Sequence, residues 1–271
     1  MPNRPNALAQ SVMIALDGES KCGKTTIIDY IADGAQTAEP GFNRIIKISA
    51  GNIYRAAAMY KMGLESAGIA KDHFEPDDAE PLRAILERPG IYDILQHDKP
   101  IGRRVSTVAK MAGIQALCET LFVSTVVSAY HTNGGGNLVV VDGRNPVECL
   151  DRHLVIGQED GQIRRNSIMP VYIDTPADVA AARMEGDFDE NVAIIIRRRT
   201  DDATRPELPA IRPAVMLDDF DAWARQFSPE AAGREGLAVP YRLDNGRASL
   251  EDLEQFGLAA AKTALAVAHR L

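Results

Sequence analysis

Short apolar runs rich in β-branched residues alternate with longer helical patterns along most of the chain. These runs predict five strands, at residues 12–17, 44–49, 137–142, 170–174 and 239–244. Apolar residues recur at helical spacing over 103–131 and again over 249–271, where Ser249 occupies the expected N-cap position. Such alternation is typical of an α/β fold, in which a five-stranded parallel sheet is flanked by helices.

Composition narrows the class of protein. The chain has 271 residues, of which 45% are hydrophobic and 25% charged, so it can bury a substantial core. A net charge of -8 disfavours a protein that wraps a long stretch of nucleic acid. No apolar run approaches the roughly 18 residues of a membrane span, and the first ten residues lack a signal peptide's apolar core. The three cysteines suit neither a disulfide framework nor a zinc site, and the five histidines lie far apart, so we expect a cytoplasmic protein.

The strongest motif directly follows the first predicted strand. "GESKCGKT", residues 18–25, matches G-x-x-x-x-G-K-[ST] and leads into a helical pattern, the order that a phosphate-binding loop requires. Backbone N–H groups of such a loop hold phosphate oxygens, the lysine reaches the terminal phosphates, and the Thr25 hydroxyl can bind Mg²⁺. A chance match in a glycine-containing turn is the alternative. The residues expected to bind nucleotide are Gly18, Ser20, Cys22, Gly23, Lys24, Thr25 and Thr26.

A second motif, "IRRRTDDATR" at 196–205, gathers arginines. On a helix, Arg198, Asp202 and Arg205 share one face, and Pro206 would end that helix. Guanidinium groups match phosphate oxygens, so beside a phosphate loop we expect a lid that closes on the transferring phosphate. A solvated basic helix end is the simpler alternative.

The remaining charged candidates follow the predicted strands. Asp142 ends an apolar strand, where a carboxylate that organises Mg²⁺ is expected. Arg55 in "AGNIYRAAA" and Arg144 in "VVVDGRNP" are candidates to hold an acceptor phosphate. Each arginine taken alone is more often a surface residue.

Taken in order, these segments resemble the bacterial cytidylate kinases, nucleoside monophosphate kinases of the P-loop class. The resemblance rests on "IALDGESKCGKTT", "GNIYRA", "VSTVAKMAGIQAL", "VVVDGRN", "PVYIDTPADVAAARM" and "RRRTDDATR". It implies a single P-loop kinase domain over 1–271, with an acceptor-binding insert at 50–104 and an Arg-rich lid at 184–206. It also implies ATP as donor, Mg²⁺ held at Thr25 and Asp142, and a monomer.

The motifs and the resemblance together assign roles to individual residues. Catalysis would fall to Lys24, Asp142, Arg198 and Arg205, with Asp17 as a candidate base. Arg55, Arg144 and Arg205 would lie on the acceptor phosphate, Arg198 and Asp202 on the sugar side and lid, and Ser106 beside the base.

Departures from the family pattern gather at the residues that would read the base. Asn145 stands where the family has Asp, Gln115 where it has Arg, and Ala50 where it has Ser. An amide both donates and accepts hydrogen bonds, whereas a carboxylate only accepts and a guanidinium only donates. Asn145 and Gln115 could therefore read a uracil-like edge, which is our hypothesis. The alternative is that Asn145 is a turn residue before Pro146.

Two segments, 151–166 and 214–236, are insertions relative to the family pattern, and we favour decorated surface loops for both over contacts with a bulky substrate. Two other functions stay open. One is a kinase that phosphorylates the hydroxyl of a modified pyrimidine, such as 5-hydroxymethyluracil in DNA, with Asp17 or Asp142 as base. The other is a non-catalytic nucleotide-binding regulator. A small nucleotide is the first expectation, and DNA the second.

Overall fold

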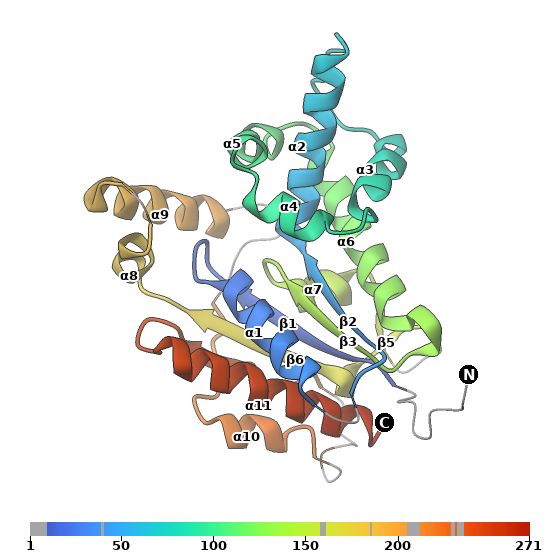
Figure 1. Cartoon of the computed structure of the whole chain (residues 1–271), viewed down its shortest axis with the longest axis vertical. Helices are drawn as coiled ribbons and strands as arrows, with labels where there is room; N and C mark the ends of the chain where they lie inside the picture. Colours follow the sequence, from blue (N-terminus) through green and yellow to red (C-terminus); the bar gives the residue numbers. More distant parts are fainter. Residues whose placement is uncertain are drawn as a thin grey trace. The chain divides into compact units, whose positions relative to one another are not determined.

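The computed structural model describes residues 10–38, 41–157, 161–184, 186–204, 212–228, 231 and 236–271. The chain packs into two compact units. The first unit comprises the described residues up to Lys47 and from Val127 onward, and the second is Ile48–Val126. Figure 1 labels the helices and strands of both units.

A five-stranded sheet runs through the fold in the order β2-β3-β1-β6-β7. Its strands are β1 (Val12–Gly18), β2 (Arg44–Ser49), β3 (Asn137–Asp142), β6 (Ile168–Asp174) and β7 (Tyr241–Asp244). β1 pairs in parallel with both β3 and β6, and β6 pairs in parallel with β7. All five strands predicted from the sequence are present, so the α/β expectation is confirmed. Because β1 is central, the loop that follows it emerges in the middle of the sheet's carboxyl edge.

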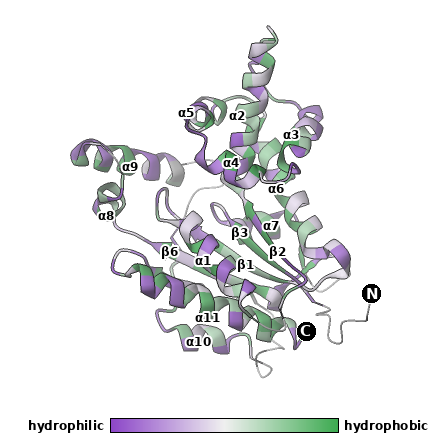
Figure 2. Cartoon of the chain, viewed as in Figure 1, coloured by the Kyte–Doolittle hydropathy of each residue, from purple (hydrophilic) through white to green (hydrophobic). Residues whose placement is uncertain are grey.

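Helices α1 (Lys24–Gln36) and α11 (Leu250–Ala268) pack against each other over one face of the sheet (Figure 1). Their buried residues Ile27, Ile31, Ala260 and Ala264 share one core with alternate β1 residues such as Ile14. The hydropathy colouring of Figure 2 shows the strands largely in the hydrophobic colour. Each Å² of apolar surface buried in this core stabilises the packing by about 25 cal/mol. This packing holds α1 against β1.

Other helices and strands of the first unit are α7 (Pro146–Arg152), β4 (Ile156–Gly157), β5 (Ile163–Arg164), α8 (Ala177–Ala182), α9 (Phe188–Ala203) and α10 (Phe220–Arg225). As expected from the sequence, Ser249 caps α11, because its hydroxyl accepts a hydrogen bond from the Asp252 N–H at 3.1 Å. None of the described helices combines the length and the hydropathy that a membrane-spanning segment needs.

The second unit is helical. It contains α2 (Ala50–Ser66), α3 (Ala79–Leu86), α4 (Ile91–His97), α5 (Lys99–Val108) and α6 up to Val126, while α6 as a whole is Ile114–His131. The single helix expected over 103–131 is wrong, because the chain breaks between α5 and α6. Gly113 adopts φ +78°, and the backbone of Phe74 lies against it, with the Phe74 N–H donating to the Ala112 carbonyl at 2.8 Å.

The second insertion is not a surface decoration in its described part. Trp223 of α10 has no exposed surface, and its indole N–H donates to the Pro170 carbonyl of β6 at 3.1 Å. Phe220, Tyr241 and Phe256 surround it in an aromatic cluster. The surface-loop expectation for 214–236 is therefore wrong here, since this segment completes the core beside β6 and β7.

The first insertion forms a small parallel pair, β4 with β5, that buries Ile156 and Ile163. Arg164 is exposed, and the Arg165 guanidinium lies 3.7 Å from the Asp151 carboxylate. Residues 158–160 of this insertion lie outside the described residues.

Candidate phosphate-binding site

The loop between β1 and α1 takes a conformation that only glycine fits at two positions. Gly18 has φ +142°, and a Cβ there would meet the Ile173 carbonyl at 2.6 Å. Gly23 has φ +95°, and a Cβ would meet the Asn245 amide nitrogen at 2.5 Å. Both glycines of the motif are therefore required by left-handed backbone and by close neighbours.

Two distant turns hold this loop through one carbonyl. The Cys22 carbonyl accepts hydrogen bonds from the Thr175 hydroxyl at 3.0 Å and from the Asn245 amide at 2.6 Å. Thr175 follows β6 and Asn245 follows β7, so the sheet's neighbouring strands fix the loop. The Cys22 side chain is buried, so Cys22 contributes to the loop through its backbone.

The start of α1 presents unpaired donors. Gly23 is the N-cap and supplies no side-chain cap, and the first turn of α1 contains no acidic residue. Among the described residues, no backbone acceptor bonds the N–H groups of Thr25 or Thr26, while the Lys24 N–H donates to the Cys22 sulfur. With the helix dipole, such N–H groups form an anion-binding site, because the partial positive charge at the helix start is uncompensated.

Lys24 lies folded back across the loop. Its ammonium donates to the carbonyls of Gly18 at 2.6 Å and Glu19 at 3.1 Å. Burial by itself would lower the pKa of Lys24, but the Cys22 sulfur and the carboxyls of Asp142 and Asp17 outweigh it and raise the pKa. The ammonium therefore stays charged at neutral pH inside the loop, as a phosphate ligand must.

Asp17 ties the loop to the turn after β3. Its Oδ1 accepts hydrogen bonds from the backbone N–H groups of Gly18 at 2.6 Å and Asn145 at 3.2 Å. Burial raises the pKa of this carboxyl, although these hydrogen bonds and Lys24 act against the rise. Among the described residues Oδ2 forms no hydrogen bond, so one oxygen of Asp17 can accept a bond from a ligand.

Asn145 has a backbone reason to be an amide. It is the N-cap of α7 and adopts the left-handed conformation, φ 43° and ψ 53°, which asparagine tolerates better than most residues. Its side chain makes no capping hydrogen bond to α7. The turn interpretation thus holds for the backbone, while the side chain's expected role in base reading stays a prediction.

Asp142 is the last residue of β3, and it pairs in register with Leu16 of β1. It is buried, and its charge acts on Lys24. Arg144 follows two residues later and is half-buried. The first unit therefore brings Asp17, Lys24 and Asp142 together, as the sequence led us to expect.

Helix α9, where the sequence predicts a lid, meets the loop through an arginine that the sequence did not single out. Arg199 of α9 lies with its guanidinium 2.7 Å from the Glu19 carboxylate, and it donates to the Thr175 carbonyl at 2.8 Å. Arg198, the expected residue, is exposed. Helical phase was the available signal, because Arg199 lies four residues after the buried Ile195 and eight after the buried Asn191.

The other expected lid residues are only partly described. Asp202 lies in the last turn of α9, which ends at Ala203. Arg205 and Pro206 lie outside the described residues. A second arginine that the sequence did not single out, Arg183 after α8, donates to the Asn245 carbonyl at 2.7 Å.

The second unit carries the three other acceptor candidates on three helices. Arg55 lies on α2, with its guanidinium 3.4 Å from the Asn52 amide oxygen, and Ser106 is exposed on α5. Gln115 begins α6, where its oxygen accepts from the Tyr54 hydroxyl at 2.5 Å and its nitrogen donates to Glu119 at 2.7 Å. Both ends of the Gln115 amide are thus bonded inside this unit.

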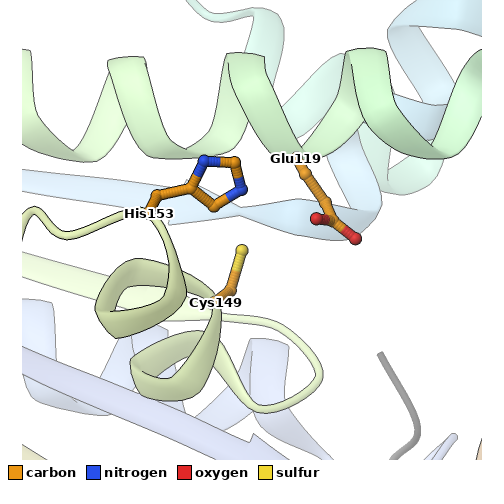
Figure 3. A group of neighbouring side chains, drawn as sticks. All are labelled: Glu119, Cys149 and His153. Atoms are coloured by element: carbon orange, nitrogen blue, oxygen red, sulfur yellow. The ribbon is translucent and has the colours of Figure 1, made fainter. Parts of the chain in front are cut away.

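Figure 3 draws Cys149 on α7, His153 directly after α7, and Glu119 on α6. Cys149 and His153 belong to the first unit and Glu119 to the second, so the three side chains do not form a group within either unit. We assign no metal to them.

The chain matches no protein-family model and no curated protein.

Proposed function

We propose that this protein is a phosphotransferase that moves a phosphoryl group from ATP to a pyrimidine nucleotide. The observation that carries the proposal is the loop of residues 18–26. It joins a central parallel strand to a helix whose Thr25 and Thr26 N–H groups have no backbone acceptor, with a charged lysine folded across it. That combination suits the terminal phosphates of a nucleoside triphosphate.

The donor set also suits a divalent cation. Thr25 offers a hydroxyl at the start of α1, and Asp142 offers a carboxylate at the end of β3, both oxygen ligands of the kind that Mg²⁺ prefers. When bound, Mg²⁺ would offset the negative charge of the phosphates. Lys24 and the α1 N–H groups would orient the donor.

Arginines supply the rest of the proposed machinery. Arg199 already lies beside the loop and would exchange Glu19 for a phosphate oxygen, because guanidinium groups bind both anions in the same bidentate way. Arg55, Arg144 and Arg205 remain the proposed ligands of the acceptor phosphate. The acceptor's base stays open between cytosine and a uracil-like ring.

One observation favours a second candidate, in which the acceptor is a neutral hydroxyl such as that of 5-hydroxymethyluracil in DNA. Asp17 adjoins the loop, keeps one oxygen without a hydrogen bond, and has a pKa raised by burial. Such a carboxylate suits a general base. The hydroxyl proton would pass to Asp17 as the oxygen forms its bond to the γ-phosphorus and ADP leaves.

The test is transfer of labelled phosphate from ATP to a panel of acceptors. The panel contains CMP, dCMP, UMP, dUMP, 5-hydroxymethyl-dUMP and an oligonucleotide with 5-hydroxymethyluracil. Labelling of a monophosphate supports the first candidate, and labelling of the oligonucleotide alone supports the second. Nucleotide binding without transfer to any acceptor would instead favour a regulator and contradict both.

Lys24→Ala is the decisive variant for the proposal. Its turnover should fall by at least about 100-fold, since a donor to the phosphates is lost while the fold is kept. Lys262→Ala, which removes an exposed lysine from α11, is the matched control and should leave turnover unchanged. Full activity in a folded Lys24→Ala protein would refute the assignment.

A further inference from the structure

The first unit contains a cavity beside the phosphate loop, and Asp17 and Asn145 are among the residues that line it. It measures about 340 Å³ and lies against β1 and β6, under the first turns of α7 and the segment 237–240. Pockets that hold small molecules start at about 300 Å³. Ala15 and Asp17 line it, whereas Ile14 and Leu16 point into the core with α1. Because strand side chains alternate, the cavity lies on the opposite face of the sheet from α1.

The walls of the cavity are mainly apolar. They include Pro146 and Val147 of α7, Pro170 and Val171 of β6, and Pro240. Such walls favour the flat faces of a ring over a strongly hydrated group, because each buried apolar face gains free energy in proportion to its area.

Two polar groups face this space from paired strands. Tyr172 and Asp17 are opposite one another in the β1–β6 register. Tyr172 is 3% exposed, yet its hydroxyl forms no hydrogen bond within the described residues. The hydroxyl is therefore available to donate a hydrogen bond to a ligand in the cavity.

The charges that line the cavity disfavour anions. Glu148 and Asp151, three residues apart on α7, line it together with Asp17. Among the described residues that line it, none is a lysine or an arginine. A carboxylate or phosphate entering here would meet three lining carboxyls, and the nearby cations, Arg165 beside Asp151 and Lys24 near Asp17, lie outside the lining.

We propose that this cavity is a binding site for a small planar ring that is neutral or cationic and carries a hydrogen-bond donor beside an acceptor. The ring's donor bonds to the Asp17 oxygen Oδ2, and its acceptor receives the Tyr172 hydroxyl. The apolar walls cover the two ring faces. The site is distinct from the phosphate loop, although Asp17 touches both.

A matched series of probes on one ring tests the proposal. 2-Aminopyrimidine has a donor beside an acceptor, pyrimidine has acceptors only, and pyrimidine-2-carboxylate is an anion. Their affinities for the full chain are measured by NMR titration. We expect saturable binding of 2-aminopyrimidine, about tenfold weaker binding of pyrimidine for one lost hydrogen bond, and no saturation by the carboxylate. Equal binding of the anion, or no saturable binding of 2-aminopyrimidine, overturns the proposal.

Variants then locate the bound ring. Tyr172→Phe should weaken 2-aminopyrimidine about tenfold, because it removes only the hydroxyl. Tyr241→Phe is the matched control, since Tyr241 lies on the neighbouring strand β7 and stacks on Phe256 instead. Lys262→Ala, at an exposed lysine of α11, should bind the probe as the wild type does. An unchanged affinity in Tyr172→Phe, or lost binding in Lys262→Ala, would place the ring elsewhere and overturn the assignment. The wild-type probe series remains decisive if a variant does not fold.

Discussion

The phosphate loop and the acceptor side of the second unit carry the same expectation, binding of a phosphorylated ligand, but they are built differently. The loop is one contiguous stretch, held from below by Thr175 and Asn245 through the Cys22 carbonyl. Acceptor candidates of the second unit lie on three separate helices, and Gln115 is already bonded to Tyr54 and Glu119.

That difference shows which sequence motifs predict the geometry of a site. A contiguous loop defines its own geometry, since glycine conformations and the helix start follow from neighbouring residues. Residues that are far apart in the sequence form a common site only through packing. A side chain expected to bind a ligand can instead form a hydrogen bond inside the protein. The predictions below test how far the two regions differ.

The largest expected effect is at Gly23. Gly23→Ala should abolish nucleotide binding and destabilise the protein by more than about 2 kcal/mol, because a left-handed alanine costs about 1–2 kcal/mol and here also clashes with Asn245. Gly68→Ala is the control, since Gly68 has φ +76° with no atom near its Cβ position. Denaturant unfolding and nucleotide titration measure both. Equal losses in the two variants would show that backbone strain alone matters.

Asn245 should come next. Asn245→Ala removes a buried hydrogen bond to the Cys22 carbonyl, which should cost about 1–3 kcal/mol and loosen the loop. Thr175→Val leaves the Asn245 bond in place and should cost less. Thermal unfolding without ATP measures the stability of the fold. The additional stabilisation when ATP is present measures nucleotide binding by the loop. If Thr175→Val proved the more harmful, Asn245 would not be the main support.

Glu19 and Arg199 test the contact between loop and lid helix. Glu19→Gln should tighten ATP binding by about three- to tenfold, because it removes a carboxylate that competes for Arg199 and repels phosphate. Arg199→Gln should weaken binding by a similar factor. Asp201→Asn, an exposed change on the same helix, is the control. Weaker ATP binding in Glu19→Gln would contradict this account.

On the acceptor side, Tyr54→Phe should have a modest effect. It removes the hydrogen bond to Gln115 and should cost about 0.5–1.5 kcal/mol, while releasing the amide oxygen. If Gln115 reads a base, acceptor preference should change in Tyr54→Phe, and Asn145→Asp with Gln115→Arg should favour cytosine. The acceptor panel measures this. Unchanged preference in both proteins would remove these residues from base reading.

The smallest effect concerns pH and Asp17. Burial raises the folded-state pKa of this acid, so folding favours the protonated form and the cost of the charge grows as pH rises from the unfolded value of 3.8. Asp17→Asn should therefore be more stable than the wild type at pH 7, and the gap should shrink as pH falls toward that value. Unfolding at several pH values measures it. A gap that widens on acidification would have the wrong sign.

Sequence patterns located the strands well and failed where distant segments meet. Residues 103–131 keep a helical pattern throughout, but the Phe74 backbone lies against Gly113 and breaks the helix there. Trp223 stands in an apparent loop insertion, yet it is fully buried because β6 offers its indole a carbonyl acceptor. Neither contact leaves a local trace, since both partners lie tens of residues away.

By itself the sequence determined the five strands, the glycine loop, the capped closing helix and the charged residues at the strand ends, because all of these depend on short-range spacing. Tertiary structure alone decided that Arg199 rather than Arg198 meets the loop, that Asn245 and Thr175 support it, and that Asp17 and Tyr172 share a cavity. These follow from strand register and helix phase, which set what each side chain touches across long stretches of chain.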